Sequence, residues 1–308
     1  MSRPILICIV LVVLTAGAFG HDVSIRGRFT CGGAAVKNAL VRLLDQDYLV
    51  DDILADGWTD ENGEFELSGD GVDGWNGNPD VFIKLEYNYL NKMVVKDRTL
   101  RVRYETSEIT NNFSGKSDIG TINVNNEHCR VYQLFREAIL DYTLRSENDN
   151  LPYDYLTVHT DALLSLVSGT RKPWSNIDTI RVPGGYPLNA TTARHELAHT
   201  LRHAMDGGRL HWWADISSYS YVQPHHCNMR SNPGFAFNEG WAIYWSGNCK
   251  CSEGSDMNVE GHVAARLCEL ARCKSDSQMW DILESNPGTI HSYAEFEEKL
   301  FSKYQPAC

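Results

Sequence analysis

Short segments of alternating polar and apolar residues fill the part of the chain that follows residue 20. Residues 64–67 alternate as a half-buried strand does, and the Asn62-Gly63 pair before them is a strong hairpin-turn signal. Further strands are expected at 23–29, 40–44, 81–87, 99–104 and 119–124. Repeated short strands without helical periodicity predict a β-sandwich domain over residues 21–125.

The hydrophobic period changes after residue 125. Apolar residues at steps of three and four predict an amphipathic helix over 127–145, and strands are expected at 155–158 and 177–182. A second helix is expected from about residue 191 to residue 206. Helices and strands in this order predict a separate domain over residues 126–308.

A strongly apolar helix is predicted after residue 232. Asn232 suits the N-cap, Pro233 suits the first helical position, and Gly247 can end the helix. Almost every residue between them is apolar, so we expect this helix to be mostly buried. The remaining helices are expected at 262–273, 278–284 and 293–304, the last with Ser292 as its N-cap.

The first 20 residues have the pattern of a signal peptide. Arg3 is followed by an apolar run, and small residues at Ala18 and Gly20 predict cleavage before His21. A membrane anchor is the alternative, but the apolar run is short for a bilayer span. We therefore expect a secreted, extracellular protein without a membrane span.

The cysteines agree with secretion. The chain has nine, and Cys8 would leave with the signal peptide. The remaining eight predict disulfides, which can pair in 105 ways. The Cys249-x-Cys251 and Cys268-x4-Cys273 spacings also allow a structural zinc site as an alternative. Sequons at Asn112 and Asn189 fit a secreted glycoprotein.

The charge excludes one class of partner. The net charge is −12, and loss of Arg3 with the signal peptide makes it −13. An acidic protein repels phosphate backbones, so no nucleic-acid partner is expected. No pattern indicates association between chains, so a monomer is expected.

The first domain resembles a known family. The residues that carry the resemblance are Gly27-Arg28-Phe29-Thr30-Cys31-Gly32-Gly33, Leu40 to Leu43, Asp51 to Ala55 and Thr59 to Gly69. Residues 23–124 thereby resemble the transthyretin-like family, which is abundant in nematode secretomes. The resemblance implies an extracellular, prealbumin-like sandwich that has no catalysis of its own and binds small ligands or cell-surface partners.

The second domain contains the motif His195-Glu196-Leu197-Ala198-His199. Residues four apart lie on one helix face, so both imidazoles can reach one metal ion. Zinc suits two nitrogen ligands. Glu196 is rotated by about 100° from His195 and can face a zinc-bound water without binding the metal. This arrangement is the HExxH motif of zinc peptidases.

Glu239 is the best candidate for the third ligand. It lies in the apolar helix after residue 232, where a lone carboxylate is costly unless it is paired or binds a metal. A salt bridge to a buried arginine is the structural alternative. His195, His199 and Glu239 would leave one zinc position open for water, as catalytic sites do.

This ligand set resembles the gluzincin group of metallopeptidases. The Asn238-Glu239-Gly240-Trp241-Ala242 run is similar to the Asn-Glu-Gly-aromatic-Ala run of the aminopeptidase N family. The resemblance implies an α+β zincin-like domain. Ile243 stands where thermolysin has a second-shell aspartate, and the exopeptidase Gly-Ala-Met-Glu-Asn motif is missing. These departures favour an endopeptidase.

Several residues are candidates for supporting roles. His226 and Tyr221 are the preferred stabilisers of the oxyanion, ahead of Tyr219, His225 and Tyr244. Asn238 and Asp215 are candidates to orient a ligand histidine through its second nitrogen. His203 is expected to pack beside the site, because three ligands on successive turns of one helix lie too far apart for one ion. The 177–182 strand is the candidate edge strand for pairing with an extended substrate.

These expectations combine into a secreted zinc peptidase acting on peptides or proteins. Zinc would lower the pKa of its bound water toward about 7, and Glu196 would take the proton and pass it to the leaving amine. Three alternatives remain open. The first is an extracellular ligand- or cell-surface-binding protein with an inactive zinc domain. The second is a carrier or cell-surface bridge in which the sandwich is the main function and the peptidase is auxiliary, and the third is a metal-dependent hydrolase of non-peptide amides.

Overall fold

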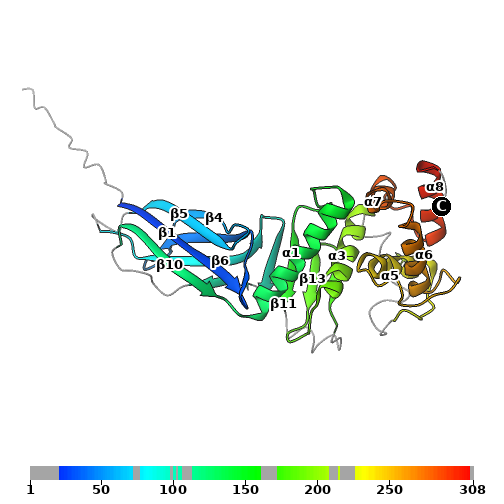
Figure 1. Cartoon of the computed structure of the whole chain (residues 1–308), viewed down its shortest axis with the longest axis horizontal. Coiled ribbons are helices and arrows are strands. Elements are labelled where there is room, and N and C mark those ends of the chain that lie inside the picture. The colour runs from blue at the N-terminus through cyan, green and yellow to red at the C-terminus, as the bar shows by residue number, and fades with distance from the viewer. Residues whose placement is uncertain are drawn as a thin grey trace, which may run out of the picture.

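The structure is a computed structural model, and it describes residues 21–71, 77–97, 100–101, 103–105, 113–160, 172–207, 214–215 and 226–305. The molecule is elongated: strands near the N-terminus form one end and helices near the C-terminus form the other (Figure 1). No helix in the described ranges is long and apolar enough to cross a bilayer. Residues 1–20, where the signal peptide is predicted, lie outside the described residues.

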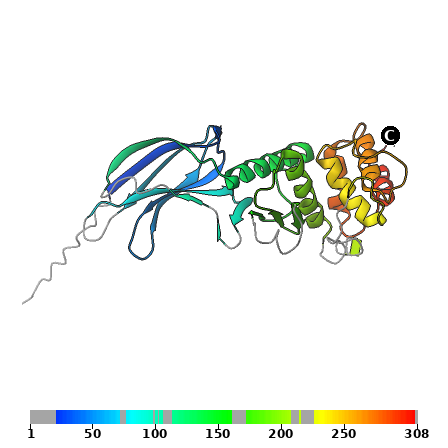
Figure 2. The same ribbon diagram turned by 90° about the horizontal axis from the view of Figure 1, so that it is seen from below.

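One sheet of the strand-rich end is built around β1 (His21–Cys31). It pairs antiparallel with β5 (Glu64–Gly71) on one side and parallel with β10 (Gly115–Asn123) on the other. Short β2 (Ala34–Ala35) pairs with the end of β1. The sheet forms one layer of a sandwich, and Figure 2 shows the second layer beneath it.

The second sheet runs in the order β12-β13-β11-β7-β6-β3-β4. Its strands from the N-terminal region are β3 (Ala39–Asp45), β4 (Asp52–Trp58), β6 (Val81–Tyr89) and β7 (Met93–Asp97), with short β8 (Leu100–Arg101) and β9 (Arg103–Glu105) beside β7 and β6. The expected strands at 23–29, 40–44, 64–67, 81–87 and 119–124 are confirmed. Strands β4 and β7 were not expected from the pattern.

Apolar side chains from both layers meet in the sandwich core. Ile25 and Phe29 of one sheet are fully buried, as are Leu43 and Ile83 of the other. The rings of Phe29 and Phe65 stack with their centroids 5.3 Å apart. Alternation in the strands therefore has the expected result, with one face of each sheet turned inward.

The second sheet continues beyond residue 125. Strand β11 (Leu156–Thr160) pairs parallel with β7, so that Leu156 lies opposite Met93. Strand β13 (Thr179–Val182) pairs parallel with β11, and β12 (Trp174–Asn176) pairs antiparallel with β13. The strand-rich and helical regions therefore share one sheet, although a change of pattern separates them in the sequence.

The expected edge strand at 177–182 needs correction. Ile177 has a φ of 55° and belongs to a tight turn, and the strand begins only at Thr179. Strand β13 has neighbours on both sides, so it cannot accept a further strand. Of the described strands, β12 is the outermost at this end of the sheet.

Helix α1 (Glu127–Ser146) joins the two regions. The hydroxyl of Tyr132 donates to the carbonyl oxygen of Lys37 in the sandwich at 2.7 Å. A disulfide links Cys31, at the end of β1, with Cys129 in the first turn of α1. A covalent bond and buried contacts thus fix the helix against the end of the sandwich.

The helical region surrounds an aromatic core. Its further helices are α3 (Ala190–Met205), α5 (Pro233–Trp245), α6 (Glu260–Leu270), α7 (Asp276–Ser285) and α8 (Tyr293–Lys303), close to the expected ranges. Trp280 of α7 contacts Trp241 and Trp245 of α5 edge to face, each at a centroid distance of 4.9 Å. Such pairs stabilise beyond the area that they bury.

Disulfides also stabilise the helical region. Cys227 pairs with Cys251 and Cys249 with Cys268, Cys273 is disulfide-bonded as well, and Cys308 lies outside the described residues. The disulfide expectation is confirmed for these cysteines. The alternative of a structural zinc site at these positions is wrong, because a disulfide sulfur has no thiolate to offer a metal.

Candidate metal centre

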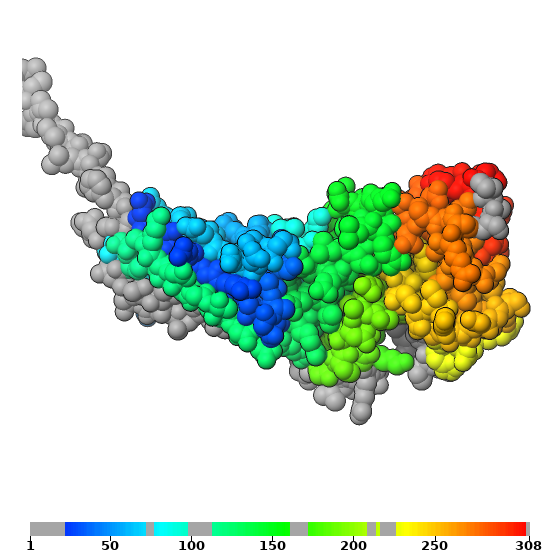
Figure 3. Space-filling model, viewed as in Figure 1, coloured from blue at the N-terminus to red at the C-terminus, as the bar shows by residue number. Residues whose placement is uncertain are grey.

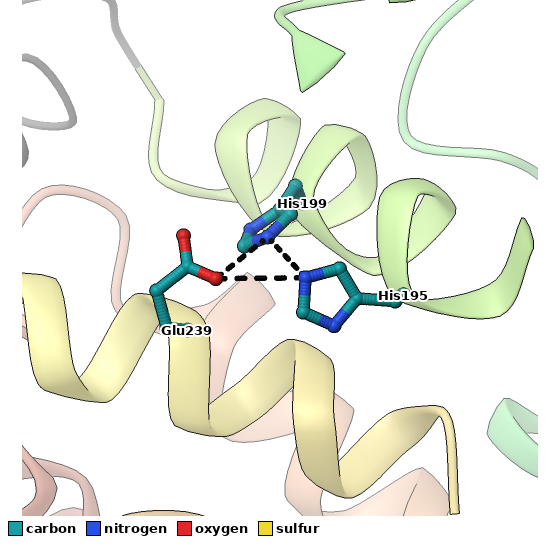
Figure 4. A group of neighbouring side chains, drawn as sticks. All are labelled: His195, His199 and Glu239. Atoms are coloured by element: carbon teal, nitrogen blue, oxygen red, sulfur yellow. Dashed lines mark hydrogen bonds and ion pairs between the residues drawn. The ribbon is translucent and has the colours of Figure 1, made fainter. Parts of the chain in front are cut away.

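Helix α3 carries the first two candidate ligands, and its start is set by a cap. The side chain of Asn189 accepts a hydrogen bond from the amide of Thr192 at 2.9 Å. Leu197 and Leu201 are fully buried on the core face of the helix. His195 and His199, four residues apart, therefore share the face that is turned toward α5 (Figure 4).

Helix α5 carries the third candidate ligand and begins where the sequence predicts. Asn232 caps it by accepting from the amide of Phe235 at 2.7 Å, and Pro233 occupies the first turn. The helix is buried nearly all round, and it packs against both α3 and α6. Its burial brings Glu239 to the interface with α3.

The three candidate ligands converge on one point (Figure 4). The Nε2 atoms of His195 and His199 lie 3.1 Å apart. Oε2 of Glu239 lies 3.5 Å from the first and 3.4 Å from the second. In the described residues this is the one group of three or more His, Cys, Asp and Glu side chains with the spacing of a metal site.

These distances fit a tetrahedral zinc site. Ligand atoms at about 2.0–2.1 Å from a tetrahedral ion lie about 3.3–3.4 Å from one another. The three measured separations, from 3.1 to 3.5 Å, bracket that value. Two imidazoles and one carboxylate form a donor set of catalytic zinc sites, which keep a fourth position open.

The electrostatics favour a cation at the same point. The side chain of Glu239 is 11% exposed, and those of His199 and His195 are 11% and 22% exposed. The imidazoles can offset the buried negative charge only when they are protonated, whereas a divalent cation offsets it with both rings neutral. Oε2 of Glu239 faces the Nε2 atoms of both imidazoles, as a third metal ligand would.

Glu196 lies beside the site without joining the ligand group. Its side chain is buried, one residue after the first histidine. The hydroxyl of Ser175 on β12 contacts its carboxylate oxygen Oε2 and donates to its backbone carbonyl at 2.9 Å. Ser175 has no signal in the sequence, because a strand of three residues shows no period.

Of the residues predicted to stabilise an oxyanion, His226 and Tyr244 lie in the described ranges, and neither is part of the ligand group. His226 is described, is exposed, and does not belong to the group. Tyr221 lies outside the described residues, as do Tyr219 and His225. The hydroxyl of Tyr244 donates to the carboxylate of Asp276 on α7, so this residue serves packing between helices.

The candidates for orienting a ligand histidine are also corrected. Both carboxylate oxygens of Asp215 lie 3.0 Å from Nδ1 of His291, so Asp215 pairs with a histidine outside the site. The amide of Asn238 is buried and bonds to no group in the described ranges. His203 is buried on α3, which agrees with the packing role expected of it.

A second polar cluster lies at the C-terminal end of α3. Burial lowers the pKa of the Arg202 guanidinium, which donates to the carbonyl of Ile290 at 2.9 Å and lies over the ring of Phe237. Burial raises the pKa of the Asp206 carboxyl, which accepts from the Gly288 amide. The cluster anchors the end of the helix against the segment before α8.

The strand-rich region matches a known family. The model of the Transthyretin-like family matches residues 26–101. Transthyretin-like protein 46 of Caenorhabditis elegans is 37% identical over 71 residues, which are 22% of this chain and 40% of the relative. Transthyretin-like protein 5 of the same species is 36% identical over 71 residues, 22% of this chain and 51% of the relative. The chain thus spans only about half the length of these curated relatives.

Residues 26–101 therefore form a transthyretin-like domain, as the sequence indicates. The three candidate ligands lie outside the matched residues. In a comparison of structures, a 9R-lipoxygenase from Cyanothece matches with a TM-score of 0.24 and 21% identity, over 34% of this chain and 16% of that chain. That score is too low to indicate a shared fold.

Proposed function

We propose that the protein is a zinc-dependent metallopeptidase of the gluzincin type, with a zincin-like domain after residue 125. The observation that carries the proposal is the convergence of His195, His199 and Glu239 at tetrahedral spacing. These side chains would hold the ion. The chemistry that zinc supplies in such a site is Lewis-acid polarisation of a carbonyl oxygen and acidification of water.

Glu196 is the general base of the proposed reaction. Its place in the motif rotates its side chain by about 100° from that of His195, and its side chain is buried. The carboxylate accepts the proton of the attacking water and then donates it to the departing amine nitrogen. Glu196→Gln removes this capacity while it keeps size and shape.

An extended peptide is the substrate class that the surroundings favour. Strand β12 is the outermost described strand at its end of the sheet and contacts α3 directly, so a peptide could pair with it beside the site. Figure 3 shows the surfaces of the α3 and α5 segments next to each other, in agreement with the packing of these two helices. Pairing along a strand engages both sides of a scissile bond, which is typical of an endopeptidase.

Secretion belongs to the proposal as well. The apolar segment at residues 5–16 suits a signal peptide. Three disulfides in the described residues suit an oxidising, extracellular environment. In that setting the transthyretin-like domain would bring the peptidase to a ligand or surface.

A second candidate function is an extracellular binding protein whose zinc domain is inactive. The observation that favours it is the turn between β3 and β4, where Tyr48, Leu49 and Val50 are 100%, 86% and 76% exposed. Exposed neighbouring apolar side chains of this size mark contact sites. Under this alternative the sandwich performs the function, and the zinc site contributes only to stability.

Hydrolysis of a mixed peptide library by the purified full chain, read by mass spectrometry, separates the two candidates. The variants are Glu196→Gln and, as a matched control, Ser146→Ala, which removes a buried hydroxyl from α1. We expect internal cuts by the wild type and the control, and a loss of about 10²–10⁴-fold in Glu196→Gln with zinc retained. Equal cleavage by wild type and Glu196→Gln would contradict the proposed mechanism, and no cleavage by zinc-loaded wild type would favour the binding protein.

A further inference from the structure

Ser175 is the polar residue through which the outer strand touches the proposed base. Its side chain is buried on β12, although this strand lies at the margin of the described sheet. Its hydroxyl reaches two atoms of Glu196, the backbone carbonyl oxygen at 2.9 Å and the carboxylate oxygen Oε2. Strand and helix are thus connected at the residue that the proposed reaction uses.

The two acceptors compete for one hydroxyl proton. A carboxylate is the stronger acceptor, because hydrogen bonds to an ionised group are shorter and about twice as strong as neutral ones. The backbone carbonyl of Glu196 lies inside α3, where it also has the usual helical amide as a partner. The hydroxyl of Ser175 therefore favours the Glu196 carboxylate.

This bond restricts a side chain that is otherwise flexible. A glutamate has three side-chain torsions, and fixing them lowers its conformational entropy before a reaction begins. A base must be held close to its productive geometry, since an error of about 1 Å can cost 10²-fold in rate. A buried hydroxyl on a strand is a rigid anchor for this purpose.

We propose that Ser175 is a positioning residue, which fixes the carboxylate of Glu196 in one orientation and links it to the strand along which a peptide would pair. The inference rests on the proposed peptidase function. Substrate that pairs with β12 would contact the strand that carries the anchor. Binding at the strand and orientation of the base are therefore coupled through one side chain.

Removal of the hydroxyl should lower turnover more than binding. In Ser175→Ala we expect kcat to fall about 10- to 100-fold, with KM and zinc content close to those of the wild type. Ser175→Thr keeps a hydroxyl at the same position on a strand and should recover most of the activity. In the Glu196→Gln background, Ser175→Ala should cause no further loss, because the group that it positions is already inactive.

A double-mutant cycle gives a readout that needs neither substrate nor metal. Thermal unfolding of the metal-free full chain is measured for the wild type, Ser175→Ala, Glu196→Ala and the double variant. If the two side chains bond, the changes in Tm of the single variants do not add, and the double variant loses less than their sum. Ser146→Ala combined with Glu196→Ala is the control pair, for which the changes should add.

The outcomes separate this inference from the function on which it rests. Additive changes in Tm would show that the bond is absent and would overturn the inference whatever the activity. Coupled changes in Tm with unaltered kcat in Ser175→Ala would show a merely structural bond, and would overturn the positioning role. Full activity of Glu196→Gln would overturn the proposed function itself. A coupled cycle, a lowered kcat and rescue by Ser175→Thr together support the inference.

Discussion

The strand-rich and helical regions of the molecule share a sheet, but a buried carboxylate has different partners in each of them. In the sandwich, the buried carboxylate of Glu86 on β6 pairs with Arg42 of the neighbouring strand at 3.1 Å. In the helical region, the buried carboxylate of Glu239 faces two histidines at 3.4 and 3.5 Å. An arginine is charged at every relevant pH, so the first carboxylate belongs to a structural pair, whereas the second suits a shared cation.

The similarity to known proteins also differs between the two regions. The family match lies in the strand-rich region, where the core is formed by alternating apolar side chains. The candidate metal centre lies in the helical region, outside that match. The family match and the candidate metal centre thus lie in different parts of this chain, so the family match does not bear on the function of the centre.

The largest effect on stability is expected at the disulfide between Cys31 and Cys129, which is the covalent joint between the two regions. Replacing both Cys31 and Cys129 by serine should lower the free energy of unfolding by about 2–5 kcal/mol. In the chain-entropy view the loss grows with the length of the closed loop. The sequence separation here is 98 residues, compared with 19 for Cys249 and Cys268.

The matched control is the double serine variant at Cys249 and Cys268. Chemical denaturation of both variants beside the wild type measures the difference. We expect the larger loss for the joint, and also a broader transition, because the helices lose their covalent link to the sandwich. A smaller loss at the joint than in the control would show that the shared sheet alone holds the regions together.

A smaller effect is expected at the pair of His291 and Asp215. Burial lowers the pKa of the imidazole, but the hydrogen bond and the charge of Asp215 outweigh it, so the pKa lies above its ordinary value. Because the pKa of His291 is higher in the folded than in the unfolded protein, protonated His291 stabilises the fold. This stabilisation is complete at a pH below the unfolded pKa of about 6.5 and is lost as the pH rises through the folded pKa. The imidazole is about one third exposed, so the contribution should be about 1 kcal/mol or less.

The measurement is thermal unfolding of wild type, His291→Gln and Asp215→Asn between pH 5.5 and 8.5. The advantage of the wild type over either variant should shrink as the pH rises. A constant advantage across this range would mean that the pair is held by packing alone. The pair lies outside the candidate metal centre, so the test concerns only how α8 and its preceding segment are anchored.

Local patterns predicted much of this molecule. Asn232 and Pro233 mark the start of α5 because capping and a fixed φ act within one turn. The four-residue spacing of His195 and His199 determines that they share a face. Glu239 could be chosen because a lone carboxylate in an apolar helix requires a partner. The structure then brings these three residues together, as the sequence predicts.

Features that depend on pairing between distant segments were not predictable in this way. Nothing local in β7 or β11 shows that they are neighbours, so the shared sheet was missed. Strand β12 is too short to show alternation, so Ser175 was missed as well. His226 is exposed, and Asp215 pairs with His291. Both residues lie outside the long helices, so the hydrophobic period of a helix does not predict which side chains they contact.

Zinc content of the purified full chain shows whether His195, His199 and Glu239 form a metal centre. It should be determined by elemental analysis after dialysis against metal-free buffer, for wild type, Glu196→Gln and Glu239→Gln. We expect one tightly bound zinc ion per chain in the wild type and in Glu196→Gln. In Glu239→Gln, loss of a ligand should weaken binding by more than the 10- to 100-fold typical of outer-shell changes. Equal zinc in Glu239→Gln, or none in the wild type, would contradict the assignment of these three residues as a metal centre.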